Sequence, residues 1–387
     1  MKIVLVSPSY PFKGGISQYS ALLFRHLTQR NQVIWVSFSR LYPQTLFPGK
    51  TDHDDSRFFP GGNPKRLPLL DSLNPLTWVH AANRIVREKP DLVIFPWWVT
   101  FWAPLYLTII FLVKRRSRSR ILFLCHNVIE HESGSLKRWL SQTVLSRGDY
   151  FVVHSAQEKE NLVRLAGPVS VINTPHPSYG AFNAERMSKK EARRRIGIDG
   201  RRVVLFFGFV RRYKGLTYLL RSMPAMIRKV PLRLLVVGEF WEKERPYQKL
   251  IRELGLEEHV SLVNRYVRNE EIPAFFQAAD LVVLPYISVT GSGLVQLAFG
   301  FHTPVVASRI GALAEAVEDG KTGILVPPRD SRALARAIIG FYRRGDGRKM
   351  AARIKKDGER FSWNKLVEAI ETLSGRTGEG KDRDRAA

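Results

Sequence analysis

Cysteine is almost absent from this sequence, and so are the motifs of several common functional classes. Cys125 is the single cysteine among 387 residues, so no disulfide can form within the chain, which fits a reducing compartment. His126 follows it on an expected strand and should face the other side of the sheet, which argues against a Cys–His nucleophilic pair. Zinc-ligand spacing, an RNA-recognition signature and a basic heptad region are all missing, so a dedicated nucleic-acid module has little support.

Acidic residues are scarce relative to basic ones. Asp and Glu together number 35 against 61 Lys and Arg, which gives a formal net charge of +26. Such an excess favours polyanionic partners, for example anionic lipid headgroups or phosphorylated substrates. Basic clusters occur at 114–120, 189–195 and 343–344. Solvated surface would explain most of them, and contact with an anionic membrane surface is the functional alternative.

Long apolar runs are equally few. Ile3–Val6 is too short for a signal peptide and is followed by two prolines. Residues 92–113 carry no charge and are long enough to span a membrane. However, Pro96 and Pro104 interrupt the run and 91–95 has the pattern of a buried strand, so a strand, an aromatic loop and an apolar helix are preferred. The aromatic loop could belong to the core or meet lipid or a hydrophobic acceptor; its members are Trp97, Trp98, Phe101 and Trp102.

Short β-branched runs alternate with helical patterns along the whole chain, which is typical of parallel sheets covered on both faces. Strands are expected near 2–6, 32–38, 91–95, 120–125, 149–154, 169–173, 203–207, 232–237, 259–263, 281–285, 304–308 and 322–326. Helices are expected near 16–29, 75–89, 104–114, 134–146, 157–166, 216–229, 245–254, 271–278, 293–300, 311–317 and 331–343. Residues 41–73 are polar and rich in proline and glycine, so a long loop is expected there.

Each half of the chain opens with a strand that runs through a glycine-containing turn into a helix. In the first half the strand at 2–6 precedes Gly14 and Gly15, and in the second the strand at 203–207 precedes Gly215. Such a turn presents free backbone N–H groups and the positive end of a helix dipole, which suits an anion. Two units of this kind facing each other would form a cleft for a phosphorylated ligand.

Two segments of the second half give the sequence a family resemblance. One is the basic turn from Gly208 to Gly215, and the other is Gly291-Ser292-Gly293-Leu294-Val295 before the strand at 304–308. With the two Rossmann-like halves, these segments resemble family 4 glycosyltransferases, which are retaining, nucleotide-sugar-dependent enzymes. The resemblance implies an α/β GT-B fold, with two facing Rossmann-like domains and an interdomain cleft.

The sequence patterns and the resemblance together predict the domain boundaries. We expect an N-terminal acceptor-side domain (1–178), a linker (179–200), a nucleotide-sugar domain (201–358), a C-terminal helix that crosses back to the first domain (359–374) and a disordered tail (375–387).

The donor site is assigned through the resemblance. Arg211 and Lys214 would neutralise the departing diphosphate, although the family more often places the arginine directly after the glycine, where this chain has Phe209. An ordinary exposed basic turn is the structural alternative. The family's two glutamates are replaced by Thr290 and Ala298. The remaining donor contacts are expected from Gly15, Thr290, Ser292, Gly293, Leu294 and Val295.

The first domain supplies one further catalytic candidate. His126 ends a predicted strand, and the resemblance implies contact with the donor sugar; a purely structural hydrogen bond is the alternative. His131 and Glu132 are candidates for acceptor contact. Metal ligation by His131 with its acidic neighbours is conceivable, but the resemblance implies a metal-independent enzyme without a cofactor. Glu239, at another strand end, could reach nucleotide or sugar.

Together these features predict a cytoplasmic hexosyltransferase-type enzyme that transfers a sugar from a nucleoside-diphosphate donor to a glycan or lipid-linked acceptor. The helix at 135–146 places Trp139 beside Lys137 and Arg138, which suits core packing or peripheral contact with the inner face of a membrane. Two alternatives stay open. One is a catalytically degenerate scaffold protein in membrane glycan assembly, and the other is a sugar-nucleotide epimerase, for which no acid/base pair is evident.

Overall fold

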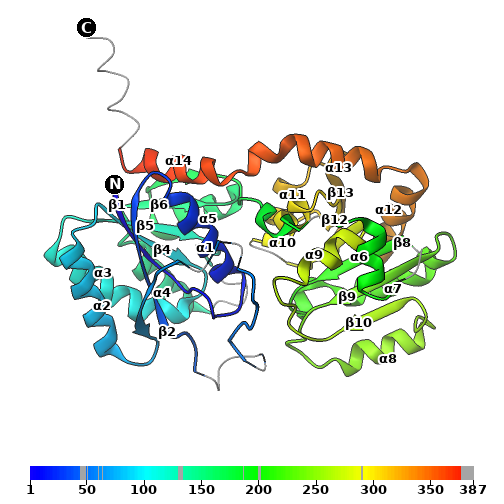
Figure 1. The fold of residues 1–387 in the computed structure, drawn as a ribbon, viewed down its shortest axis with the longest axis horizontal. Coiled ribbons are helices and arrows are strands. Elements are labelled where there is room, and N and C mark those ends of the chain that lie inside the picture. Colours follow the sequence, from blue (N-terminus) through cyan, green and yellow to red (C-terminus); the bar gives the residue numbers. More distant parts are fainter. Residues whose placement is uncertain are drawn as a thin grey trace, which may run out of the picture. The chain divides into compact units, whose positions relative to one another are not determined.

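The computed structural model describes residues 1–43, 49, 51–59, 61–62, 64–129, 134–185, 187–198, 202–288 and 291–375. They form two compact units. Unit 1 contains Met1–Asp55, Phe59–Pro177 and the chain from Ser362, and unit 2 contains Ser56–Phe58 and Ser178–Phe361. Each unit is a parallel β-sheet with helices packed on it (Figure 1). All the strands and helices predicted from the sequence are present.

Unit 1 is built on a parallel sheet whose strands have the order β3-β2-β1-β4-β5-β6-β7. Its strands are β1 (Lys2–Val6), β2 (Gln32–Arg40), β3 (Leu67–Asp71), β4 (Leu92–Trp97), β5 (Arg120–Cys125), β6 (Tyr150–Val153) and β7 (Ser170–Asn173). Its helices are α1 (Gly15–Leu27), α2 (Pro75–Glu88), α3 (Ala103–Arg116), α4 (Ser135–Leu145), α5 (Ala156–Ala166) and α14 (Trp363–Leu373). Because helices cover both faces, the central strands are apolar on both sides.

The uncharged run at 92–113 folds as β4, a 3-10 turn (Thr100–Trp102) and α3. Trp97 and Trp102 are each 1% exposed, while Trp98 and Phe101 are partly buried against the same core. In the described part of the chain, no helix is long and apolar enough to cross a membrane. The aromatic loop is therefore mainly core.

The prediction of a loop throughout 41–73 was wrong, because β3 lies within it. This strand pairs in parallel with β2 at the edge of the sheet. Pro68 sits inside it, and proline is tolerated at a sheet edge, where an N–H can be spared. The sequence Leu-Pro-Leu-Leu-Asp is short and half-buried, so its strand pattern is weak.

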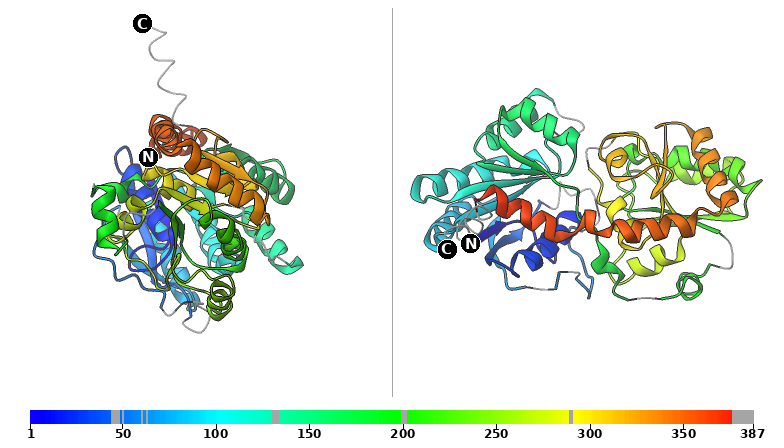
Figure 2. Two further views of the ribbon diagram at one scale, coloured as in Figure 1. Left: turned by 90° about the vertical axis from the view of Figure 1, so that its right-hand side faces the viewer. Right: turned by 90° about the horizontal axis from the view of Figure 1, so that it is seen from above.

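Helix α14 belongs to unit 1 although it is the last helix along the chain. It packs against α1 (Figure 2), where the Asn31 side chain donates to Glu371 Oε1 over 3.0 Å. The rings of His26 and Trp363 are stacked with centroids 5.7 Å apart. Buried Leu366 and Ile370 provide the apolar face that holds the helix on the unit.

Unit 2 is built on a parallel sheet with the strand order β10-β9-β8-β11-β12-β13. Its strands are β8 (Arg202–Phe207), β9 (Leu232–Val237), β10 (Val260–Val263), β11 (Leu281–Leu284), β12 (Val305–Ser308) and β13 (Gly323–Val326). Its helices are α6 (Lys189–Arg195), α7 (Leu216–Ile227), α8 (Arg245–Glu253), α9 (Ile272–Ala278), α10 (Gly293–Gly300), α11 (Gly311–Ala316), α12 (Ser331–Arg344) and α13 (Gly347–Lys356).

Two helices of unit 2 were not predicted. Helix α6 lies in the segment 179–200 that the sequence assigns to a linker, and Lys189 and Arg193 of this helix form ion pairs with Asp280 at 2.6 and 2.8 Å. Helix α13 buries Met350 and Ile354 on one face. Both are short and highly basic, so their apolar positions are too few to stand out. Residues 376–387, most of the predicted tail, lie outside the described residues.

Candidate functional site

The basic turn of unit 2 lies at the carboxyl edge of its sheet, directly after β8. The turn begins at Gly208 (φ 93°), continues through a 3-10 turn (Arg212–Lys214) and ends at Gly215 (φ 71°), which caps α7. A Cβ on Gly215 would lie 1.9 Å from the carbonyl oxygen of Pro285. Both the backbone angle and this close approach require glycine, so Gly215 fixes how the turn enters the helix.

Lys214 is buried inside this turn, with 7% of its surface exposed. Its Nζ lies close to Gly208, 3.1 Å from the position that a Cβ on that glycine would occupy. The same Nζ lies 5.9 Å from the ring centre of Tyr286. Among the described residues no carboxylate lies within ion-pair distance of it. Burial, with a smaller contribution from the charge of Arg211, lowers the pKa of Lys214 to about 7. An anion bound here would restore the full charge of this ammonium group.

Arg211 is exposed at the start of the turn and lies among aromatic rings. Its guanidinium carbon is 5.3 Å from the ring centre of Tyr213 and 5.9 Å from that of Trp241. Trp241 in turn stacks on Phe209, with ring centroids 4.1 Å apart. These contacts hold the guanidinium beside the turn while its N–H donors stay accessible.

The N-terminus of α10 approaches the same turn. Ser292 caps the helix through its Oγ, which accepts a hydrogen bond from the Leu294 N–H at 3.3 Å. Leu294 Cδ1 lies 3.3 Å from where a Cβ of Gly208 would be. The structure thus brings together Gly208, Lys214 and the start of α10, including Gly293 and Val295. Ala298 is fully buried in α10, and Thr290 lies outside the described residues.

In unit 1, His126 follows β5 and belongs to a group of three histidines. The sequence pointed to His126 but not to its two neighbours, His154 and His176. His154 directly follows β6 and His176 lies shortly after β7, so all three lie at the carboxyl edge of the sheet. Their ring centroids are 5.0 to 6.2 Å apart, and Tyr19 of α1 packs edge-on against His126 at 4.5 Å. The available signal was that each histidine lies at or shortly after the carboxyl end of a predicted strand.

Burial lowers the pKa of all three imidazoles, so each is neutral at pH 7. The value is about 4 for His154 and about 3 for His176, and it lies well below the ordinary value for His126. His154 Nδ1 lies 2.9 Å from the Thr174 carbonyl, which can only accept, so Nδ1 carries the proton. His154 Nε2 then accepts from the Tyr19 hydroxyl at 3.0 Å.

The His126 side chain differs from its two neighbours in its hydrogen bonding. Its backbone N–H donates to the Trp97 carbonyl at 2.8 Å, which fixes the residue at the end of β5. Its Nε2 is buried and has no hydrogen-bond partner among the described residues. A neutral imidazole with an unused nitrogen can donate to or accept from a hydroxyl, but it cannot balance a phosphate charge.

The remaining candidates are placed as follows. Helix α1 begins at Gly15, and its N-cap residue, Gly14 with φ 113°, makes no side-chain hydrogen bond to the helix. Glu239 is buried after β9. His131 and Glu132 lie outside the described residues. Within the described residues, no group of three or more His, Cys, Asp or Glu side chains is arranged to hold a metal ion.

Solved structures with the same architecture define the class of fold. The chain aligns with sucrose-phosphate synthase from Thermosynechococcus elongatus at a TM-score of 0.74 and 19% identity, covering 96% of this chain and 98% of that one. It aligns with HepE of Anabaena, solved with UDP and glucose, at a TM-score of 0.74 and 20% identity, covering 97% and 99%. The two parallel α/β units therefore form a GT-B fold.

Family models place the chain within this class. Residues 13–176 match the model "Glycosyltransferase Family 4", and residues 201–344 match "Glycosyl transferases group 1". The matches fall in different units and together cover most of the chain. The chain belongs to the family 4 GT-B glycosyltransferases.

Curated relatives agree with this assignment. The chain is 31% identical over 246 residues to a D-inositol 3-phosphate glycosyltransferase of Saccharomonospora viridis, covering 59% of this chain and 56% of the relative. A similar match to the enzyme of that name from Corynebacterium urealyticum covers 60% of the relative, so the chain spans less than two thirds of both. It is 26% identical over 350 residues to a GDP-mannose-dependent alpha-(1-6)-phosphatidylinositol monomannoside mannosyltransferase of Mycolicibacterium smegmatis, covering 87% and 88%.

Proposed function

We propose that this protein transfers a sugar from a nucleoside-diphosphate donor to a hydroxyl of a glycan or lipid-linked acceptor. The observation that carries the proposal is the buried Lys214, whose ammonium group has no carboxylate partner among the described residues. A buried cation requires an anion or loses its charge, and here it lies beside a glycine turn and two helix N-termini. A diphosphate satisfies all three features.

In the proposed mechanism, Lys214 and Arg211 stabilise the charge that develops on the departing diphosphate. The bond between the anomeric carbon and the phosphate oxygen breaks, and the acceptor oxygen bonds to the same carbon. The acceptor proton passes to the departing phosphate, which acts as the base. His126 would contact the donor sugar. Retention of configuration and independence from metal are what the resemblance implies, and they remain predictions.

The names of the relatives narrow the choice of substrates to test. Relatives are named for inositol 3-phosphate and for a phosphatidylinositol mannoside, and one uses GDP-mannose. HepE has been solved with UDP-glucose. We therefore propose UDP- and GDP-sugars as donors and phosphorylated or lipid-linked polyols among the acceptors. We also propose a peripheral association with the inner face of a membrane, supported by the net charge of +26.

A panel of nucleotide sugars tests the proposed activity. One donor class should raise the unfolding temperature by roughly 5 °C or more at a concentration far above its dissociation constant. Release of the nucleoside diphosphate should then depend on an added acceptor. Binding without turnover across many acceptors would instead support the scaffold alternative, for which the replacement of two family glutamates by Thr290 and Ala298 is the argument. No shift with any nucleotide sugar would contradict both.

The affinity for a nucleoside diphosphate should also depend on pH. In the free protein the pKa of Lys214 is about 7, and a bound diphosphate would raise it by favouring the charged amine. Above pH 7 the protein must take up a proton to bind, so the affinity should fall by up to about tenfold per pH unit. Titration calorimetry between about pH 6 and 9 measures this slope. The arginine in Lys214→Arg stays charged over this range, so the affinity of this variant should change little with pH. An equal pH dependence in the wild type and in Lys214→Arg would contradict the placement of Lys214 at the diphosphate.

A further inference from the structure

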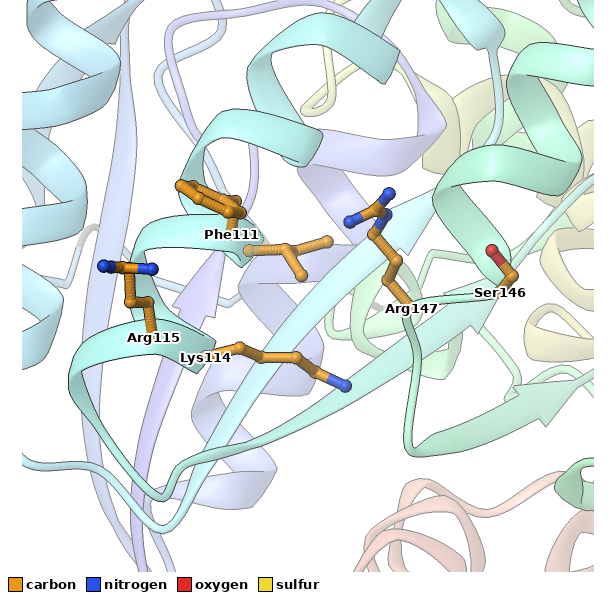
Figure 3. A pocket seen from close by; sticks show the side chains of 6 residues that line it. Phe111, Lys114, Arg115, Ser146 and Arg147 are labelled. Carbon is orange, nitrogen blue, oxygen red and sulfur yellow. The ribbon is translucent and has the colours of Figure 1, made fainter.

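A basic pocket lies on unit 1 between α3 and the end of α4. It has a volume of about 480 Å³ and is lined by Ile110, Phe111, Lys114, Arg115, Ser146 and Arg147 (Figure 3). Figure 3 shows Arg147 and Lys114 extending into the space between the two helices. None of these residues is among the donor-site candidates, and the basic turn and the start of α10 lie in unit 2.

The pocket carries positive charge that is only partly neutralised. Lys114 pairs with Asp149 at 3.1 Å, and Asp149 also accepts from the Ile121 N–H and lies 3.6 Å from Arg120. Among the described residues, Arg115 and Arg147 have no ion-pair partner. These two arginines therefore remain available to an external anion.

Exposed apolar side chains lie on both of the helices that contribute to the pocket. Phe111 is 54% exposed on α3, and Trp139 and Leu136 are 58% and 68% exposed on α4. At 3.6 residues per turn, Leu136 and Trp139 lie within an arc of about 60° on one face of α4. The opposite face of α4 packs into the core through Val144 and Leu145. Helix α4 thus presents apolar groups to both the core and the outside.

We propose that this surface docks the protein on a bilayer containing anionic phospholipid. Arg147 and Arg115, with Lys114, would bind the headgroup phosphate, while Phe111, Trp139 and Leu136 enter the headgroup region. Large aromatic side chains mixed with cations are typical of interfacial binding, and a cation near an anionic membrane strengthens binding by about fivefold. This inference rests on the membrane association in the proposed function, and it names the surface responsible.

Vesicle sedimentation with the full chain tests the proposal. The protein should bind vesicles of equal parts phosphatidylcholine and phosphatidylglycerol, and bind phosphatidylcholine alone much more weakly. Arg115→Gln with Arg147→Gln should reduce binding at least about tenfold, since two cations are removed from the contact. Arg228→Gln with Lys229→Gln removes the same charge from exposed positions of unit 2 and should reduce binding about threefold or less.

The apolar part of the surface has its own test. Phe111→Ala with Trp139→Ala should reduce binding at least about tenfold, and this loss should persist at high salt, where the effect of the arginines is screened. Leu76→Ala, at a 78% exposed position of α2, is the matched apolar control and should leave binding unchanged. Brominated lipid should quench a fluorescence component that is absent from Trp139→Phe.

The outcomes separate this surface from the proposed function. Wild-type binding that is unchanged by both double substitutions would overturn the surface and leave membrane association standing. No vesicle binding by the wild type would overturn both. If the arginine variant lost binding to polyuridylate but still bound vesicles, the two arginines would form a nucleic-acid site, and the proposed lipid contact would be wrong. Unchanged affinity for UDP or GDP in every variant shows that the fold and the donor site are intact.

Discussion

Replacing Lys214 by alanine should weaken the binding of UDP or GDP by about ten- to a hundredfold, because a charge-assisted contact to the diphosphate is lost. The amine is buried at the carboxyl edge of the sheet of unit 2, and a water that filled its space could not supply its positive charge. Isothermal titration calorimetry measures the dissociation constant directly. We expect turnover with any donor to fall at least as much, since the charge on the diphosphate grows as the sugar leaves.

Two further variants separate charge from packing. Lys214→Met keeps most of the side-chain volume and removes the amine, so it should lose as much affinity as Lys214→Ala while unfolding at nearly the wild-type temperature. Lys229→Ala removes an exposed lysine beyond the other end of α7 and should bind as the wild type does. Wild-type affinity in Lys214→Met would exclude the amine from the diphosphate site.

Replacing Gly215 by alanine should destabilise unit 2 by about 3 kcal/mol or more. The new Cβ would lie 1.9 Å from the Pro285 carbonyl oxygen at a φ of 71°. Relief requires a shift either of the turn that holds Lys214 or of the segment after β11, so nucleotide binding should also fall by about tenfold or more. Scanning calorimetry follows the unfolding of unit 2, and titration with UDP or GDP follows the site.

Gly255→Ala is the matched control, since Gly255 has a similar φ of 61° and open space around the position of a Cβ. This substitution carries only the backbone cost of a left-handed alanine, about 1 kcal/mol. It should leave nucleotide affinity unchanged. Equal effects of the two substitutions on stability would show that the close approach to Pro285 contributes nothing.

The periodicity of the sequence was sufficient to predict the sheets but not all of their edges. Buried strands such as β1 and β8 are continuous apolar runs, and this pattern arises directly from burial on both faces. The edge strand β3 contains a proline and is half-exposed, so nothing local distinguishes it from a loop. Its strand conformation depends on pairing with β2, which is a tertiary contact.

The two parts of the candidate site differ in how much the sequence revealed. Lys214 and Arg211 lie in one local motif, so their shared turn could be predicted from its residues. His154 and His176 lie far along the chain from Tyr19, and only the pairing of β5, β6 and β7 brings them to His126. No regular spacing along the sequence indicates that these side chains are neighbours.

The sequence alone determined the two-unit α/β fold, the position of the basic turn and the excess of positive charge, because each is written in local patterns of burial, glycine and charge. Tertiary structure decided the properties of those residues. Packing buries Lys214 and lowers its pKa, keeps the histidines neutral, and leaves Arg115, Arg147 and Trp139 on the surface. Burial and the identity of neighbouring groups depend on contacts between distant segments, and these contacts exist only in the folded chain.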